Sequence, residues 1–241
     1  MIDIKNLSYS VDNIQLFKDA SIHIPKDKIT VLVGPNGVGK TTLLKIISEI
    51  IKPQSIEMTK NCRELFYLPQ RIKYPQGITL EEYVESSFFK QSWKWFLSNE
   101  DKRKIDEVLE VLEIPDKKRT LVDNLSSGEL QKANFALGLV SNADLLLLDE
   151  PTSNMDLVNQ IKILNMLKKL TTQGISSLVV MHDINLSASY GDYFIGITKE
   201  RKIISANKKE FFTPEILQEI FGISFKVIST DEDFHIQIFN S

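Results

Sequence analysis

Residues 34–41 constrain the fold of this chain more than any other part of the sequence. They read Gly-Pro-Asn-Gly-Val-Gly-Lys-Thr and match the pattern G-x-x-x-x-G-K-[ST] at every fixed position. Residues 29–33, which are typical of a buried strand, precede them, and a helix-like stretch from Lys40 to about Ile51 follows. A glycine-rich turn between a buried strand and a helix is the setting in which this pattern binds phosphate.

The chemistry of phosphate binding explains the residue types in this loop. Glycines let the backbone wrap closely around phosphate oxygens, so that its N–H groups and the start of the helix attract the anion. Lys40 places a positive charge on the β- and γ-phosphates, and the Thr41 hydroxyl is a hard oxygen ligand for Mg²⁺. The predicted nucleotide-binding residues are Gly34, Pro35, Asn36, Gly37, Val38, Gly39, Lys40, Thr41 and Thr42. Kinases, GTPases, recombinases and motors share such a loop, so it indicates nucleotide binding and no more.

A second motif places two acids after an all-leucine run. Residues 145–148 are four leucines, and Asp149 and Glu150 follow them. An acid at the end of a buried strand beside a phosphate loop can hold Mg²⁺, and the next acid can orient or deprotonate a water. We therefore predict that Asp149 is the metal residue and Glu150 the base. The alternative is a pair of solvated acids that cap the next helix.

Composition excludes several other classes of protein. The 241 residues carry a net charge of −3, so no excess of positive charge favours nucleic-acid binding. One cysteine excludes an internal disulfide, and three histidines far apart in sequence exclude a Cys/His zinc cluster. No apolar stretch is long enough to span a bilayer, and the first residues do not form a secretory signal. We expect a protein of the cytosol.

The order of the expected elements indicates an α/β fold. Short β-rich runs, among them residues 65–68 and 178–181, alternate with helical patterns such as residues 157–170, which favours a parallel sheet. Residues 79–122 have helical periodicity and no strong strand, so we expect a helical insertion. Near the end of the chain, a helix capped by Thr213 is expected at 214–221, followed by a β-hairpin of residues 225–228 and 234–238.

Residues 125–131, Leu-Ser-Ser-Gly-Glu-Leu-Gln, resemble the signature of the ATP-binding cassette (ABC) ATPases, Leu-Ser-Gly-Gly-Gln. Other motifs of that family occur in the family's order. Tyr9 lies where an aromatic ring stacks on adenine, and Gln70 has the position of the Q-loop glutamine. Asp156 lies in the segment that corresponds to the D-loop, and His182 has the position of the switch histidine.

The resemblance implies a P-loop NTPase (RecA-like) core with an inserted helical subdomain and an N-terminal antiparallel β subdomain. It implies one domain over residues 1–241, with an α/β core and β subdomain at 1–78 and 123–210, a helical subdomain at 79–122, and a C-terminal helix and β-hairpin extension at 211–241.

The resemblance also implies how the motifs act together. Two copies form a head-to-tail homodimer that encloses two ATP molecules with Mg²⁺. Thr41, Gln70 and Asp149 hold the Mg²⁺, Glu150 activates water, and His182 steadies the γ-phosphate. The signature of one copy contacts the nucleotide held by the other, through Leu125, Ser126, Ser127, Gly128 and Glu129.

Three features depart from the usual family pattern. Ser127 replaces the usual glycine, and its side chain is expected to crowd the phosphate and loosen the dimer. Leu130 stands where many relatives have a polar residue. The spacing between Lys40 and Gln70 is short, so we expect few antiparallel strands between them.

The resemblance implies the ATP-hydrolysing subunit of an ABC transporter that imports a small solute. Residues 213–228 resemble the ending of ATPases for iron-siderophore, haem and cobalamin uptake, whereas the short Lys40–Gln70 spacing resembles zinc and manganese importers. We therefore expect import of a metal or metal chelate. The alternative is a soluble ABC ATPase without transport, of the iron–sulfur cluster assembly type.

The expected partners are a membrane permease, which holds the subunit at the inner face of the cell membrane, and an extracytoplasmic solute-binding protein. We expect the permease contact at residues 71–83. An aromatic cluster at residues 88–96 has two interpretations, packing within the helical insertion or a further surface for the permease.

Overall fold

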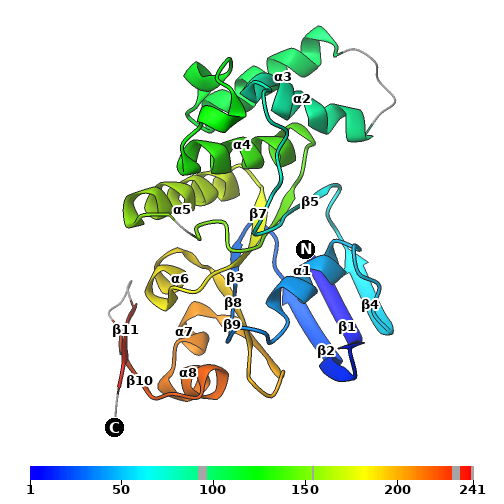
Figure 1. The fold of residues 1–241 in the computed structure, drawn as a ribbon. Helices are drawn as coiled ribbons and strands as arrows, with labels where there is room; N and C mark the ends of the chain where they lie inside the picture. Colours follow the sequence, from blue (N-terminus) through cyan, green and yellow to red (C-terminus); the bar gives the residue numbers. More distant parts are fainter. Residues whose placement is uncertain (92–96, 154, 230–233, 240–241) are drawn as a thin grey trace.

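The computed structural model describes residues 1–91, 97–153, 155–229 and 234–239. Its central sheet has the strand order β5-β6-β7-β3-β8-β9 (Figure 1). All neighbouring strands pair in parallel except β8 and β9, which are antiparallel. The α/β class expected from the alternation of strands and helices is therefore confirmed. The strands are β3 (Ile29–Val33), β5 (Leu65–Leu68), β6 (Leu145–Leu148), β7 (Ser176–Val180), β8 (Tyr193–Ile197) and β9 (Ile203–Asn207).

Two apolar layers cover the two faces of this sheet. Successive side chains of a strand point to opposite faces, so the four fully buried leucines of β6 divide between the layers. Leu145 and Leu147 pack with α1 (Lys40–Ile47) and the N-terminal strands. Leu146 and Leu148 pack with α4 (Ser127–Val140) and α5 (Leu157–Thr172). This double burial explains why the strand is a continuous apolar run rather than an alternating one.

A separate antiparallel sheet covers the α1 side, in the order β2-β1-β4. Its strands are β1 (Ile2–Val11), β2 (Ile14–Ile24) and β4 (Ser55–Lys60). The described chain contributes only β4 to this sheet between Lys40 and Gln70, in agreement with the short spacing of those residues in the sequence.

The expected helical insertion contains α2 (Leu80–Gln91), α3 (Asn99–Val111) and two short 3₁₀ turns, Pro115–Lys117 and Val122–Asn124. Figure 1 shows α2 and α3 beyond α4, on the far side of the molecule from the antiparallel sheet. Ile105 and Leu109 of α3 are fully buried in the same layer as α4. Of the aromatic cluster, Phe88 packs partly buried against this layer, and the side chains at 89 and 93–96 lie outside the described residues.

The C-terminal part of the chain contains α6 (Ile184–Tyr190), α7 (Lys208–Phe211), α8 (Pro214–Phe221), β10 (Phe225–Ser229) and β11 (Phe234–Ile238). Thr213 caps α8 as predicted, since its hydroxyl accepts a hydrogen bond from the Ile216 amide at 3.3 Å. Strands β10 and β11 pair antiparallel, as expected for the terminal hairpin. The Asn185 side chain of α6 binds the backbone of Ile236 through both its oxygen and its nitrogen, which attaches the hairpin to the core.

The structure corrects two element boundaries. Helix α1 ends at Ile47 rather than near Ile51, because Ser48 caps it and Glu49 has a φ of 61° that no helix accommodates. Strand β7 begins at Ser176, two residues before the apolar run, since Ser176 and Ser177 are themselves buried in the sheet. None of the helices in the described part of the chain is long and apolar enough to cross a membrane.

Candidate nucleotide-binding site

The predicted phosphate loop lies between β3 and α1, at the carboxyl end of the central strand. Gly34 has a φ of 150°, and a Cβ there would collide with the carbonyl oxygen of Ile197 in β8. Gly39 has a φ of 112°, and a Cβ there would lie 3.1 Å from Cζ of Phe17. Both positions therefore require glycine for backbone conformation and for space, which keeps the backbone amides of the loop accessible.

Lys40 begins α1 and is only 6% exposed. Its ammonium group donates hydrogen bonds to the carbonyl oxygens of Gly34 at 2.7 Å and Pro35 at 2.9 Å, so it lies within the curve of the loop. Burial lowers the pKa of Lys40, and the charges of Glu150 and Asp149 oppose that shift. No acidic residue occupies the first turn of α1. A buried positive charge at an uncompensated helix start suits a phosphate group.

Asp149 follows β6 and is 3% exposed. Its Oδ1 accepts a hydrogen bond from Thr41 Oγ1 at 3.1 Å, and its Oδ2 accepts one from the Tyr67 hydroxyl at 3.5 Å. Burial, reinforced by the charge of Glu150, raises the pKa of Asp149. The structure thus brings together Thr41 and Asp149, as predicted from their chemistry.

Tyr67 is a contributor that the motif analysis missed. Tyr67 of β5 pairs with Leu147 of β6, and Asp149 follows Leu147 by two residues. Residues two apart in a strand share a face, so Tyr67 and Asp149 point to the same side of the sheet. No single motif predicts this contact, because it depends on the pairing of β5 with β6, two strands that are far apart in the sequence.

Glu150 contacts two of the other predicted site residues, Gln70 and His182. It has a φ of 52°, and its carboxylate is 18% exposed. Gln70 Nε2 donates to Glu150 Oε2 at 2.5 Å, and His182 Nε2 lies 2.6 Å from Glu150 Oε1. Gln70, Glu150 and His182 follow β5, β6 and β7, three adjacent parallel strands whose carboxyl ends share one edge of the sheet. Sites of α/β proteins form at this edge.

The signature residues form a second cluster at the start of α4. Ser126 is the N-cap, and its hydroxyl accepts the Glu129 amide at 3.3 Å while Glu129 Oε2 accepts the Ser126 amide at 2.9 Å. These bonds, together with Lys117 3.0 Å away, lower the pKa of Glu129 to about 2. Ser127 is the first residue of α4 and is exposed. Leu125 precedes the cap and is partly buried.

Gly128 and Asp156 meet at Asn159 in the first turn of α5. A Cβ on Gly128 would lie 3.3 Å from Asn159 Oδ1, so glycine allows α4 and α5 to approach closely. Asp156 is the N-cap of α5 and accepts hydrogen bonds from the Asn159 amide at 2.8 Å and from its side chain at 2.9 Å. Asp156, the predicted D-loop residue, therefore caps its own helix. Asn154, two residues earlier, lies outside the described residues.

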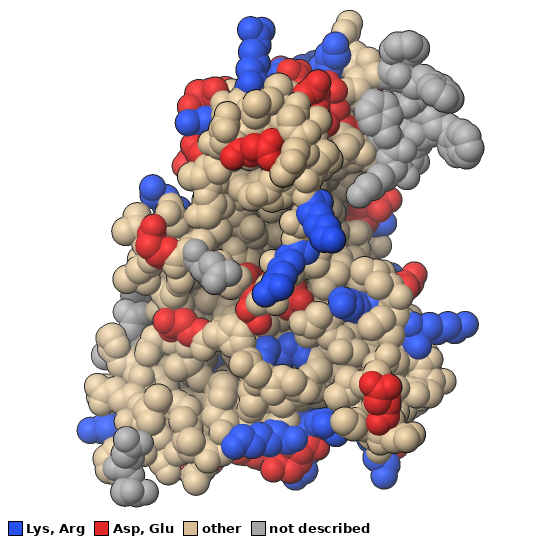
Figure 2. Space-filling view, in the orientation of Figure 1, with Lys and Arg blue, Asp and Glu red and all other residues tan. Residues whose placement is uncertain are grey.

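Tyr9 lies near the end of β1, opposite Phe17 of β2. Since the Phe17 ring lies beside Gly39, this end of the antiparallel sheet borders the phosphate loop. Tyr9 is partly buried, which leaves part of its ring accessible to a ligand. Figure 2 shows that acidic and basic side chains come together near the middle of one face of the molecule.

Comparison with known proteins agrees with this arrangement. The family model described as ABC transporter matches residues 17–153, more than half of the chain. The chain is 35% identical over 228 residues to the iron(3+)-hydroxamate import ATP-binding protein FhuC of Bacillus subtilis (strain 168), which covers 89% of this chain and 85% of that relative. It is 29% identical over 246 residues to the petrobactin import ATP-binding protein FpuC of Bacillus anthracis, with 96% and 90% covered.

A solved structure has the same fold over almost the whole chain. It is an inward-facing conformation of a metal-chelate type ABC transporter, with a TM-score of 0.88 and 22% identity, and the match covers 99% of this chain and 96% of that one. At this identity the likeness concerns the fold. Together with the match of the family model and the identity to FhuC, it shows that this chain belongs to the ABC transporter family.

Proposed function

We propose that this chain is the ATP-binding and ATP-hydrolysing subunit of an importer for chelated iron. The names of the relatives support the substrate class, since they include importers of iron(3+)-hydroxamate and of petrobactin. The observation that carries the proposal is the convergence of Gln70 and His182 on Glu150, next to a phosphate loop whose lysine is buried.

The loop binds the triphosphate of ATP. Lys40 exchanges its bonds to the carbonyls of Gly34 and Pro35 for bonds to the β- and γ-phosphates, and the start of α1 adds its partial positive charge. Tyr9, at the edge of the antiparallel sheet, stacks on the adenine. The exposed cap of α4, with Ser126, offers a second anion-binding helix start, and it serves the nucleotide held by a second, head-to-tail copy of the chain.

The residues fit a Mg²⁺ ion that accompanies ATP. Thr41 Oγ1 and Asp149 Oδ1 are hard oxygen donors already 3.1 Å apart, and Gln70 offers a third oxygen. When bound, Mg²⁺ neutralises charge on the β- and γ-phosphate oxygens. Asp149 supplies the negative charge for this site, while Tyr67 and Thr41 fix the orientation of its carboxylate.

Glu150 acts as the general base in hydrolysis. Its carboxylate accepts a proton from water as the water oxygen bonds to the γ-phosphorus, and the bond from that phosphorus to the β-phosphate oxygen breaks to leave ADP. His182 donates a hydrogen bond to the γ-phosphate in this proposal, which its position 2.6 Å from Glu150 supports. Gln70 donates to Glu150 Oε2 and leaves a second lone pair of that oxygen for a water.

The remaining partners follow from the importer assignment. Arg71, Ile72, Lys73 and Tyr74 line a groove together with α4, directly after Gln70. We propose that a permease docks here, so that the subunit works at the inner face of the cell membrane. A solute-binding protein on the outer side delivers the iron chelate to that permease.

The test is the variant Glu150→Gln, which keeps the shape of the side chain and removes its basicity. We expect unchanged affinity for MgATP, ATP-dependent dimers by light scattering, and hydrolysis about 10²–10⁴-fold slower, the usual contribution of a general base. The control is Glu200→Gln, the same change at an exposed residue. Hydrolysis by Glu150→Gln at the parent rate would refute the role of Glu150, and copies that remain single with MgATP would refute the dimer.

Uptake of a labelled ferric chelate by vesicles that contain the co-purified permease tests the substrate class.

A further inference from the structure

The signature site contains an electrostatic conflict. Glu129 stands in the first turn of α4, where its negative charge stabilises the helix through the capping box. The same helix start is proposed to attract the γ-phosphate of ATP, which is also negative. An uncompensated carboxylate at this place would oppose the binding of the phosphate, because like charges at a helix terminus repel.

Lys117 resolves the conflict in the structure. Its ammonium nitrogen lies 3.0 Å from Glu129 Oε1, while the other carboxylate oxygen accepts the Ser126 amide at 2.9 Å. The side chains of Lys117 and Glu129 are only 35% and 26% exposed, so water screens their attraction less than that of an exposed pair. Lys132, which lines the same groove, is directed to Glu113 instead, 3.9 Å away.

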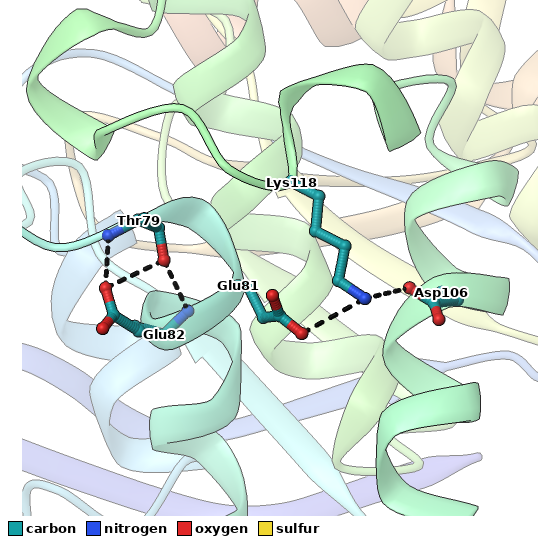
Figure 3. A network of polar contacts seen from close by, with 5 residues as sticks. All are labelled: Thr79, Glu81, Glu82, Asp106 and Lys118. Carbon is teal, nitrogen blue, oxygen red and sulfur yellow. Dashed lines mark hydrogen bonds and ion pairs between the residues drawn. The ribbon is translucent and has the colours of Figure 1, made fainter.

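The backbone next to Lys117 is held by contacts that do not involve Glu129. The next residue, Lys118, bridges Glu81 of α2 at 3.1 Å and Asp106 of α3 at 2.6 Å (Figure 3). Its carbonyl oxygen also accepts the Glu81 amide at 3.0 Å. In Figure 3 the Lys118 side chain spans the space between the two helices. These contacts hold the backbone beside Lys117, while its ammonium group lies 3.0 Å from Glu129 and 3.8 Å from Asp116.

We propose that Lys117 is a positioning residue of the signature site, which cancels the charge of Glu129 so that the start of α4 attracts the γ-phosphate held by a second copy. This inference rests on the proposed function, since it concerns the ATP-dependent dimer. Lys117 acts through Glu129 and through the local field. It leaves the capping box intact, so α4 keeps its helix-stabilising acid without repelling the nucleotide.

The alternative is that Lys117 and Glu129 form an ion pair that only stabilises the helical part of the fold. The two explanations differ for the variant Glu129→Gln. Glutamine retains the capping box and carries no charge. An ion pair with a purely structural role is lost equally when either partner is neutralised, whereas charge cancellation predicts opposite effects on the dimer, weaker without the charge of Lys117 and tighter without the charge of Glu129.

The experiment measures MgATP-dependent dimerisation by sedimentation in the Glu150→Gln background. Lys117→Gln should weaken the dimer about fivefold per composite site, hence about 25-fold for two sites, as expected for one charge at a helix start. Glu129→Gln should dimerise more tightly than the parent, because the charge of Lys117 is then uncompensated, and the double variant, which carries no net charge at this place, should match the parent within about twofold. The matched control is Lys169→Gln, a surface lysine near Glu113 at the other end of α5, which should leave the dimer unchanged.

Two further readouts separate folding from electrostatics. Thermal unfolding of the single copies should remain cooperative for Lys117→Gln, and Lys117→Arg, which keeps the charge, should dimerise like the parent. An unaltered dimer in Lys117→Gln overturns the inference, and so does a double variant as weak as Lys117→Gln. If the parent remains a single copy with MgATP, the proposed function itself is refuted. That outcome differs from an unaltered dimer in Lys117→Gln, which refutes only the inference about Lys117.

Discussion

Gly138 allows α4 to pack closely on β5, and a methyl group there tests how tightly these two elements are held. A Cβ at residue 138 would lie 2.7 Å from Cδ1, 2.8 Å from Cγ and 3.1 Å from Cβ of Phe66. These atoms are at the root of the Phe66 side chain, next to the backbone of β5. A rotation of the ring cannot relieve the contact, so the helix or the strand must move.

Two opposite effects set the size of the change in Gly138→Ala. In an exposed helix, alanine stabilises by about 1 kcal/mol relative to glycine. Overpacking of a filled core costs about 1–3 kcal/mol, and the contact with rigid atoms of Phe66 favours the upper end. We expect a net loss of roughly 1–2 kcal/mol, which lowers the melting temperature by roughly 2–8 °C in a chain of this length.

The assay is urea and thermal unfolding of the parent, Gly138→Ala, Phe66→Ala and the double variant. With Phe66 shortened, the space beside residue 138 opens, and the same Gly138→Ala change should stabilise by about 1 kcal/mol. The sign of the effect should therefore reverse between the two backgrounds. A destabilisation of equal size in both backgrounds would refute the reasoning, since it would mean that the contact with Phe66 does not limit this position.

Two predictions concern the signature. Ser127→Gly should tighten the ATP-dependent dimer and leave nucleotide affinity of the single copy unchanged, because the exposed side chain at the start of α4 is removed; an equal dimerisation constant by sedimentation would show that the serine does not crowd the phosphate. The low pKa of Glu129, about 2 instead of 4.5, means that its contribution to stability is complete above pH 4.5 and is lost as pH falls to about 2. Glu129→Gln should therefore lose less unfolding free energy than the parent between these pH values, and parallel curves would contradict that assignment.

Local patterns were sufficient to predict the phosphate loop and the acids after β6. The residues of β6 are entirely apolar, and those of β3 are apolar except for the buried Thr30, because both faces of the central sheet are covered. The cap of α8 by Thr213 is equally local, since its partner is three residues away. The residues of each motif are adjacent in the sequence, although the contacts that require glycine at positions 34 and 39 come from Ile197 and Phe17.

Patterns failed where packing at long range decides the outcome. Ile50 and Ile51 extend the apolar pattern of α1, yet the chain turns at Glu49 and leaves Ile50 61% exposed. The contact between Tyr67 and Asp149 joins strands 82 residues apart in sequence. Lys117 approaches Glu129 only because Lys118 is fixed by α2 and α3. None of these contacts has a signal in the local sequence.

The geometry around Glu150 connects catalysis with the groove proposed for the permease. Both oxygens of its carboxylate are engaged, one by Gln70 and the other by His182. Each of these contacts occupies one acceptor site of an oxygen that could otherwise face a water. Gln70 leads directly into residues 71–74, which line the groove beside α4. If a permease docks in this groove as proposed, a shift of residues 71–74 would change the contact between the Gln70 amide and Glu150.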